Sequence, residues 1–83
     1  MNVKSEEEWC ERAAAFLNHK VNDAGITHIE LARRLRKHGI METEASITSK
    51  LARGTFPATF FLACVAALEL DGVAMKEVLE LPS

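Results

Sequence analysis

Residues 27–54 read THIELARRLRKHGIMETEASITSKLARG and carry most of the positive charge of the chain. Residues 33–53 contain six of the ten basic residues but only two of the twelve acidic ones. The basic residues are Arg33, Arg34, Arg36, Lys37, Lys50 and Arg53. The 83-residue chain has a formal charge of −2, so both flanks of this segment are acidic. A basic segment between acidic ends creates a local field that favours an anionic partner.

The first half of this segment predicts a short amphipathic helix. Thr27 and Glu30 have the spacing of a capping box, in which the two side chains satisfy free backbone amides at a helix start. Leu31 and Leu35 are spaced to lie on one inner face, and Gly39 ends the helix. The remaining positions are mostly cationic, which predicts a solvated surface or a surface that contacts phosphate.

The second half predicts another helix, which ends at Arg53 with Gly54 as its left-handed stop. Thr43 is a good N-cap, and Ser46, three residues later, is an alternative N-cap. Ile47 and Leu51 are expected to dock this helix on the core, because few of its other residues are apolar. We expect its exposed face to offer Ser46, Ser49, Lys50 and Arg53.

The N-terminal region predicts a helix that begins after Ser5, because Ser5 and Glu8 also have capping-box spacing. Apolar residues then recur every three or four positions. The predicted buried stripe is Trp9, Ala13, Phe16, Leu17 and Val21. The residues predicted to lie away from it are Glu11, Arg12, Asn18 and His19.

A fourth helix is predicted over about residues 57–70, where almost every position is apolar. A helix with no polar face must be covered on most sides, so we expect it at the centre of the domain, packed by the first three helices. Residues 73–81 are again apolar at intervals. They predict either a fifth helix that closes the core or an element offered to a second subunit.

Length and composition predict one compact all-α domain of four to five helices over residues 1–83. The longest apolar run, residues 60–68, is far shorter than the roughly 20 residues of a membrane span. The N-terminal stretch lacks the layout of a secretory signal, so we expect a cytoplasmic protein. Cys10 and Cys64 have no metal-binding spacing and are expected to be reduced, buried thiols.

The sequence offers little that would make an enzyme. It contains no Gly-rich phosphate loop, no H-E-x-x-H and no G-x-S-x-G. His19, His28 and His38 fall on different predicted elements, where each is expected to be a surface side chain. We therefore expect no catalytic residue, no metal and no cofactor.

Three short patterns carry a resemblance to a known family. They are ITxxELA at residues 26–32, KLxRG at residues 50–54, and Pro57 followed by an apolar run to Leu70. In these residues the chain resembles the phage-repressor-like (Cro/C1-type) helix-turn-helix domains, which are compact five-helix DNA-binding domains. The connection between Leu35 and Ile47 is longer than the roughly three- to four-residue turn of that motif allows. The resemblance therefore implies a helix-turn-helix over residues 27–54 with a lengthened turn.

The same resemblance implies functional positions. His28 would take the place of a residue that touches phosphate. Ser46, Ser49 and Lys50 would take the positions that read bases from the recognition helix.

Almost the whole chain also resembles an uncharacterised family of small bacterial proteins. The matching patterns are LARRL at residues 31–35, a glycine turn at Gly39, ITSKLARGTF at residues 47–56, and Phe60-Phe61 in the apolar helix. Membership of that family, a domain of unknown function, implies the fold and no particular activity.

Charge and resemblance together predict a transcriptional regulator that binds double-stranded DNA, with a possible homodimer formed through residues 73–81. The predicted DNA-binding residues are His28, Arg33, Arg34, Arg36, Lys37, Ser46, Ser49, Lys50 and Arg53. One alternative is a non-catalytic protein-interaction adaptor on the same fold, favoured by the acidic pI of about 5.9 and the longer turn. RNA binding is a third hypothesis, opposed by the core spacing of Trp9 and the phenylalanines, which leaves no aromatic surface for stacking bases.

Overall fold

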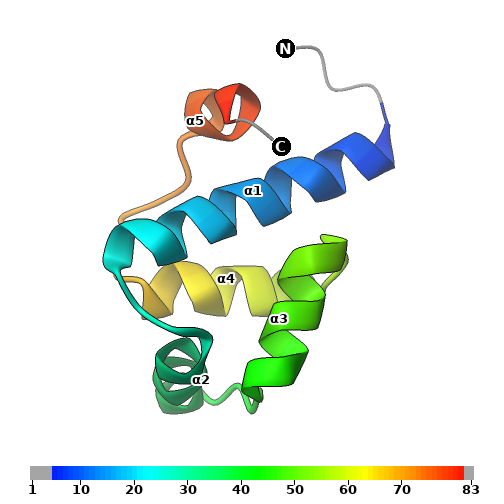
Figure 1. Ribbon diagram of the computed structural model, residues 1–83. Helices are drawn as coiled ribbons and strands as arrows, with labels where there is room; N and C mark the ends of the chain where they lie inside the picture. Colours follow the sequence, from blue (N-terminus) through cyan, green and yellow to red (C-terminus); the bar gives the residue numbers. More distant parts are fainter. Residues whose placement is uncertain (1–4, 82–83) are drawn as a thin grey trace.

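The computed structural model describes residues 5–81, which form five α-helices and contain no β-strand (Figure 1). The helices are α1 (Glu6–Ala24), α2 (His28–Lys37), α3 (Glu44–Arg53), α4 (Ala58–Ala67) and α5 (Met75–Glu80). The radius of gyration is 12.2 Å, close to the roughly 12 Å expected of a compact chain of this length. The predicted compact all-α fold is therefore confirmed.

The helices α1, α2 and α3 begin at the predicted N-caps, but only the Ser5 and Thr27 halves of the two predicted capping boxes form, and the reciprocal box is at Thr43 and Ser46. The side chains of Ser5 and Thr27 accept hydrogen bonds from the amides of Glu8 and Glu30, both at 3.1 Å. Thr43, rather than Ser46, is the N-cap of α3, and its side chain accepts from the Ser46 amide at 3.1 Å. Local side-chain chemistry thus sets where α1, α2 and α3 begin.

The centre of the domain is α1, which packs against α3, α4 and α5, while α2 packs against α3 and α4 (Figure 1). Phe16 and Leu17 of α1 are completely buried, as are Leu31 and Leu35 of α2. Ile47 and Leu51 dock α3 on this core, as predicted.

The prediction that the apolar fourth helix lies at the centre is wrong, and α4 is also shorter than the predicted 57–70. It buries only one stripe, which contains Phe60, Cys64 and Ala67. Leu62 on its other side is 65% exposed. The sequence could not show this, because a helix without polar residues gives no periodic signal for its inner face.

Two predictions for α1 are also wrong. Trp9, predicted in the core, is 44% exposed, whereas Arg12, predicted to lie outside it, is only 2% exposed. The reason is α5, which packs along α1 and places the Leu81 carbonyl where the Arg12 guanidinium donates a hydrogen bond to it. A buried charge is tolerated where such a partner is supplied.

Residues 73–81 follow the first of the two predicted alternatives, since α5 closes the core against α1. Val78 is buried and Leu79 is half-buried, while Met75 remains half exposed. Cys64 is buried and Cys10 is half-buried, and both thiols are free. Among residues 5–81, no helix has both the length and the apolar character needed to cross a membrane.

Candidate nucleic-acid interface

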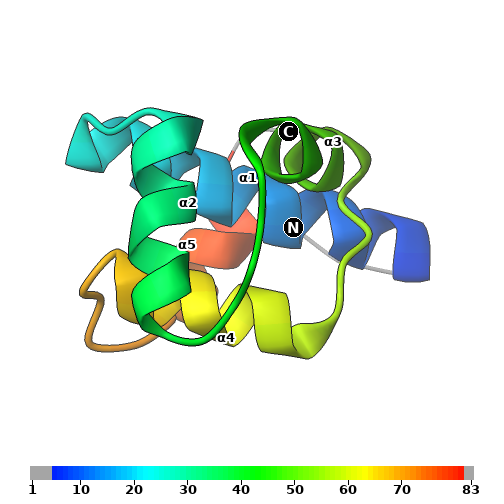
Figure 2. The ribbon, with the colours of Figure 1, turned by 90° about the horizontal axis from the view of Figure 1, so that it is seen from below.

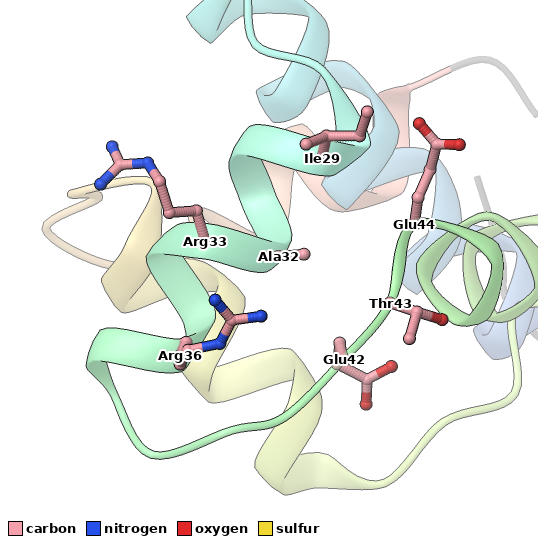
Figure 3. Close-up of a pocket in the computed structure, with 7 residues that line it drawn as sticks. All are labelled: Ile29, Ala32, Arg33, Arg36, Glu42, Thr43 and Glu44. Carbon is pink, nitrogen blue, oxygen red and sulfur yellow. The ribbon is translucent and has the colours of Figure 1, made fainter.

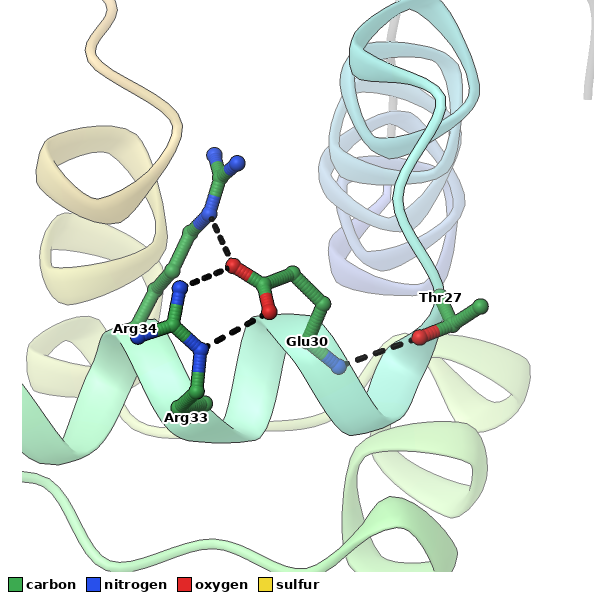
Figure 4. A network of polar contacts seen from close by, with 4 residues as sticks. All are labelled: Thr27, Glu30, Arg33 and Arg34. Carbon is green, nitrogen blue, oxygen red and sulfur yellow. Dashed lines mark hydrogen bonds and ion pairs between the residues drawn. The ribbon is translucent and has the colours of Figure 1, made fainter.

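Two of the four cations of α2, Arg33 and Arg34, are paired with Glu30, whose backbone amide donates to the side chain of the Thr27 cap (Figure 4). The Glu30 carboxylate accepts from Arg33 Nε at 2.8 Å and Arg33 Nη2 at 2.5 Å, and from Arg34 Nε at 2.9 Å. The hydrogen bonds from Arg33, and then from Arg34, lower the pKa of Glu30 to about 2. Part of the positive charge predicted to face outward is therefore balanced within α2.

Lys50 and Ser46 do not lie on the free face of α3, so the prediction that both are exposed is wrong. Lys50 forms an ion pair with Glu42, whose side chain is 8% exposed, and its Nζ lies 5.0 Å from the centre of the Phe60 ring. Ser46 Oγ accepts from the Thr43 amide at 2.9 Å and donates to Glu42 Oε1 at 2.5 Å. Both side chains fasten the α2–α3 connection to α3.

Glu42 is held as a carboxylate by these contacts. Burial alone would raise its pKa, but the hydrogen bonds from Lys50 and Ser46 outweigh burial and lower the pKa. A buried carboxylate beside Lys50 explains why a cation predicted for base contacts turns inward.

His28 joins the start of α2 to the middle of α3. Its Nδ1 and the Oγ1 of Thr48 are 2.7 Å apart and hydrogen-bonded. The position that the resemblance assigns to a phosphate contact is thus used to fix one helix against the other.

The outward surface of the two helices differs from the predicted one. On α2, Arg33, Arg36 and Lys37 are exposed, and on α3 the exposed residues include Ser49 and Arg53. Arg36, Lys37 and Arg53 form no ion pair within residues 5–81. We call this set of five residues the α2/α3 surface.

Sequence reasoning missed three further exposed residues of α3, which are Ala45, Thr48 and Ala52. The signal was available, because inward Ile47 and Leu51 place these positions on the opposite side of a 3.6-residue helix. Ala45 and Ala52, together with Ser49, give α3 an outer face of small side chains, whereas the Thr48 hydroxyl is hydrogen-bonded to His28 of α2.

A groove of about 400 Å³ separates α2 from the start of α3 (Figure 3). Ile29, Ala32, Arg33 and Arg36 line one wall, and Glu42, Thr43 and Glu44 line the other. Ile29 is 64% exposed, so the groove combines an apolar residue with walls of opposite charge.

The connection that shapes this groove spans residues 38–43. Gly39 adopts φ +82°, and the Ile40 amide donates to the Leu35 carbonyl at 3.1 Å, which turns the chain sharply after α2. α2 is seen nearly end-on in Figure 1 and lengthwise in Figure 2, whereas α3 shows the reverse, so the two helices cross steeply. Met41, within the connection, is 73% exposed.

These observations define a small five-helix domain with exposed cations on two adjoining, steeply crossed helices. The chain belongs to the family described as "Domain of unknown function (DUF6471)", whose pattern matches residues 9–73. This confirms the predicted uncharacterised family. Neither the curated proteins nor the solved structures include a significant match to the chain. The relation to phage-repressor-like domains remains a hypothesis.

Within the described part of the chain, no group of three His, Cys, Asp or Glu side chains could hold a metal ion.

Proposed function

We propose that this domain binds double-stranded DNA through the α2/α3 surface, as a cytoplasmic transcriptional regulator. The observation that supports it is the set of exposed cations Arg36, Lys37 and Arg53, which carry no internal counter-ion among the described residues and lie on adjoining helices. Exposed cations without internal partners bind phosphates by releasing counter-ions from DNA.

The outer face of α3 suits a close approach to base edges. Ala45, Ser49 and Ala52 are small and exposed, so none of them holds a duplex away from the helix. In a major groove, a serine hydroxyl can hydrogen-bond to bases and an alanine methyl can contact a thymine methyl. Of the base-reading positions implied by the resemblance, Ser49 is the one that this proposal keeps in that role.

Other predicted site residues receive positioning roles in this proposal. His28 fixes α2 to α3 through Thr48, while Ser46 and Lys50 fix the connection through Glu42. Arg33 and Arg34 are held by Glu30 and would contact phosphate only at the edge of the surface.

The direct test is fluorescence anisotropy with a pool of random duplexes at several salt concentrations. We expect affinity to fall with salt, and the Arg36→Ala/Lys37→Ala/Arg53→Ala variant to reduce the salt slope by about three, roughly one for each lost phosphate contact. Lys76→Ala, which removes an exposed cation from α5, is the control and should leave binding unchanged. Absence of salt-dependent binding to every duplex would contradict the proposal.

A second test uses Glu30→Gln. This change keeps the shape of the side chain and removes the charge that balances Arg33 and Arg34. If phosphates approach α2, the released arginines should strengthen DNA binding. Unchanged affinity in Glu30→Gln, beside a loss in the triple variant, would confine the contact to Arg36, Lys37 and Arg53.

A specific observation also favours the protein-interaction adaptor. Ile29 and Met41 are the large apolar residues exposed on α2 and on the α2–α3 connection, and Ile29 lines the groove between oppositely charged walls. Such a groove suits a peptide with an apolar side chain between charges of both signs. A partner that is lost with Ile29→Glu but kept with the Arg36/Lys37/Arg53 triple alanine variant would identify this function.

A further inference from the structure

The exposed side of α4 is an apolar surface without a partner among the described residues. Residues 58–67 contain no Asp, Glu, Lys or Arg, although 27% of the chain is charged. Ala58, Leu62 and Ala66 follow one another at intervals of four on this side, and all three are exposed. Along this line the side chains are symmetric in size about Leu62, with one large residue between two small ones, and the exposed Thr59 lies beside it.

The N-terminus of α4 differs from those of α1, α2 and α3. Each of those helices has a side-chain cap and an acidic residue in its first turn. The N-cap of α4 is Pro57, no side chain caps it within the described residues, and its first turn has no acidic residue. The positive end of the α4 dipole is thus left without an anionic neighbour on its own helix.

The opposite end of α4 carries Glu69 in a left-handed backbone conformation, with φ +59°. Gly25, Gly39 and Gly54 occupy the other positive-φ positions of the described chain, as expected from the steric cost of a Cβ there. Glu69 ends α4 through hydrogen bonds from its own amide to the Ala66 carbonyl and from the Leu70 amide to the Val65 carbonyl. Glu69 therefore adopts a backbone conformation that glycine would adopt at a lower steric cost.

We propose that α4 is the interface of a homodimer, in which two copies of the helix pack antiparallel about a two-fold axis near Leu62. Leu62 then contacts the partner's Leu62, and Ala58 faces the partner's Ala66. The same register places Glu69 beside the uncapped N-terminus of the other copy of α4. A two-fold axis requires a self-complementary surface, and the symmetric face of α4 is one.

Charge favours the antiparallel arrangement over the parallel one. A cleft beside Ala66 and Ala67 is lined by the basic residues Arg33, Arg34, Lys37 and His38 of α2 and its C-cap, and by Glu69. Parallel packing would bring the two clefts, in which basic residues outnumber the one carboxylate, close together, and would also pair like ends of the helix dipoles. Antiparallel packing separates the clefts and sets each Glu69 against a positive helix end.

This interface leaves the α3 part of the proposed DNA-binding surface free, while Arg33 and Lys37 of α2 line the cleft beside Ala66. In Figure 2, α4 runs along the lower side of the molecule and α3 lies on the upper side, so pairing through α4 leaves the outer face of α3 uncovered. The dimer can be measured without DNA.

Sedimentation equilibrium of the full chain tests the interface. We expect a dimer for the wild-type protein and a monomer for Leu62→Glu, whose helical signal should be unchanged because Leu62 is exposed. Its melting temperature should fall only by the stabilisation that association gives the wild-type protein. Ile29→Glu and Met75→Glu add the same charge at other exposed apolar residues and should remain dimeric. A monomeric wild-type protein, or dissociation by Met75→Glu and not by Leu62→Glu, would overturn the proposal; the second result would place the dimer at residues 73–81.

A disulfide trap tests the two-fold geometry. In a Cys10→Ser background, Leu62→Cys should oxidise readily to a covalent dimer, because the two thiols would meet at the axis. Ile29→Cys in the same background is the control and should oxidise slowly. Equal oxidation rates in the two variants would rule out the proposed axis.

Glu69→Gln tests the polar part of the contact. It should raise the dimer dissociation constant by roughly three- to thirtyfold, since a charge at a helix end is lost twice in a symmetric dimer. An unchanged constant would remove Glu69 from the interface and, with it, the proposed antiparallel register.

Discussion

Gly54 lies against the backbone of Cys10, so close that a Cβ on Gly54 would stand 2.6 Å from the Cys10 carbonyl oxygen. Gly54 also adopts φ +73° as the C-cap of α3. The residue therefore meets two requirements at once. It ends α3 with a left-handed turn, and it lets α3 approach the first half of α1.

Gly54→Ala should be the most destabilising glycine substitution in the domain. The left-handed conformation costs about 1–2 kcal/mol for an alanine, and the overlap with Cys10 adds about 1–3 kcal/mol. Gly39→Ala is the matched control, since Gly39 has φ +82° with nothing near its Cβ position. Urea unfolding measures the free energy of unfolding of both. Equal losses in the two variants would show that α1 and α3 separate at no cost.

Arg12→Met should loosen α5. The Arg12 guanidinium is buried and donates to the Leu81 carbonyl at the end of α5, whereas methionine keeps most of the apolar stem. We expect a loss of about 1.5–3 kcal/mol, as for hydrogen bonds to charged groups. Hydrogen exchange at the Val78 and Leu79 amides should become faster. The exposed Arg53→Met should change stability by no more than about 0.5 kcal/mol; unchanged protection of α5 in Arg12→Met would contradict the assigned role.

Lys50→Met should lower the free energy of unfolding, whether or not a ligand is present. It leaves the Glu42 carboxylate, which is largely buried, without its cation, at a cost of about 1–3 kcal/mol. Glu42→Gln should restore part of this loss in the double variant, because the unpaired charge is then gone. Thermal melts of the two single variants and the double variant form the cycle that measures this coupling. If the losses of stability in the two single variants add up in the double variant, the ion pair between Lys50 and Glu42 contributes nothing to the free energy of unfolding.

Cys64 should resist thiol reagents in the folded protein. Burial, and then the nearby Glu42 carboxylate, raises the pKa of its thiol to about 12, with Lys50 acting in the opposite direction. The reactive thiolate is therefore scarce at pH 8, and the sulfur is inaccessible. We expect Cys10→Ser protein to react with a disulfide reagent only on unfolding, and Cys64→Ala protein to react in the folded state through Cys10.

The same thiol predicts how stability depends on alkaline pH. The unfolded chain begins to lose the Cys64 proton near the ordinary pKa of 9.0, while the folded chain keeps it until about 12. The unfolded state therefore binds fewer protons in this window, and the contribution of Cys64 to stability is complete below pH 9 and falls as the pH rises. Cys64→Ala should show a shallower decline between pH 9 and 10.5. If the stability of the wild-type and Cys64→Ala proteins declines equally with pH, the Cys64 thiol ionises without any need for the protein to unfold.

Glu69→Gly should stabilise the monomer by about 1 kcal/mol, because glycine adopts the left-handed conformation without the cost of a Cβ. Glu69→Ala keeps that cost and is the control. Unfolding at protein concentrations well below the dimer dissociation constant separates this effect from association. A destabilised Glu69→Gly protein would show that the Glu69 side chain makes contacts that outweigh its backbone strain.

The features that the sequence predicted well are local ones. Ser5, Thr27 and Thr43 begin helices because their side chains meet amides three residues away, and this depends on nothing distant. Ile47 and Leu51 are the two large apolar residues of a polar helix, so their burial also followed from spacing. The all-α fold is the sum of such local signals.

The features that escaped prediction depend on contacts between distant residues. Arg12 is buried because α5 returns to it, and Leu62 is exposed because no helix of the described chain covers that side of α4. In the candidate site, Lys50 turns toward Glu42, eight positions earlier, across a connection whose course no periodicity specifies. A cation was easy to find from the sequence, but its direction depended on the nearest buried carboxylate.

The central position of α1 has a consequence for how the chain is made. α1 is synthesised before its partners α3, α4 and α5, and Arg12 reaches a carbonyl 69 positions further on. Phe16 and Leu17 therefore remain without cover on the ribosome until most of the domain has emerged, which makes nascent chains susceptible to aggregation. A product that stops short of Met75 would leave the α5-facing side of α1 bare, so we expect it to be degraded more readily than a chain that includes α5.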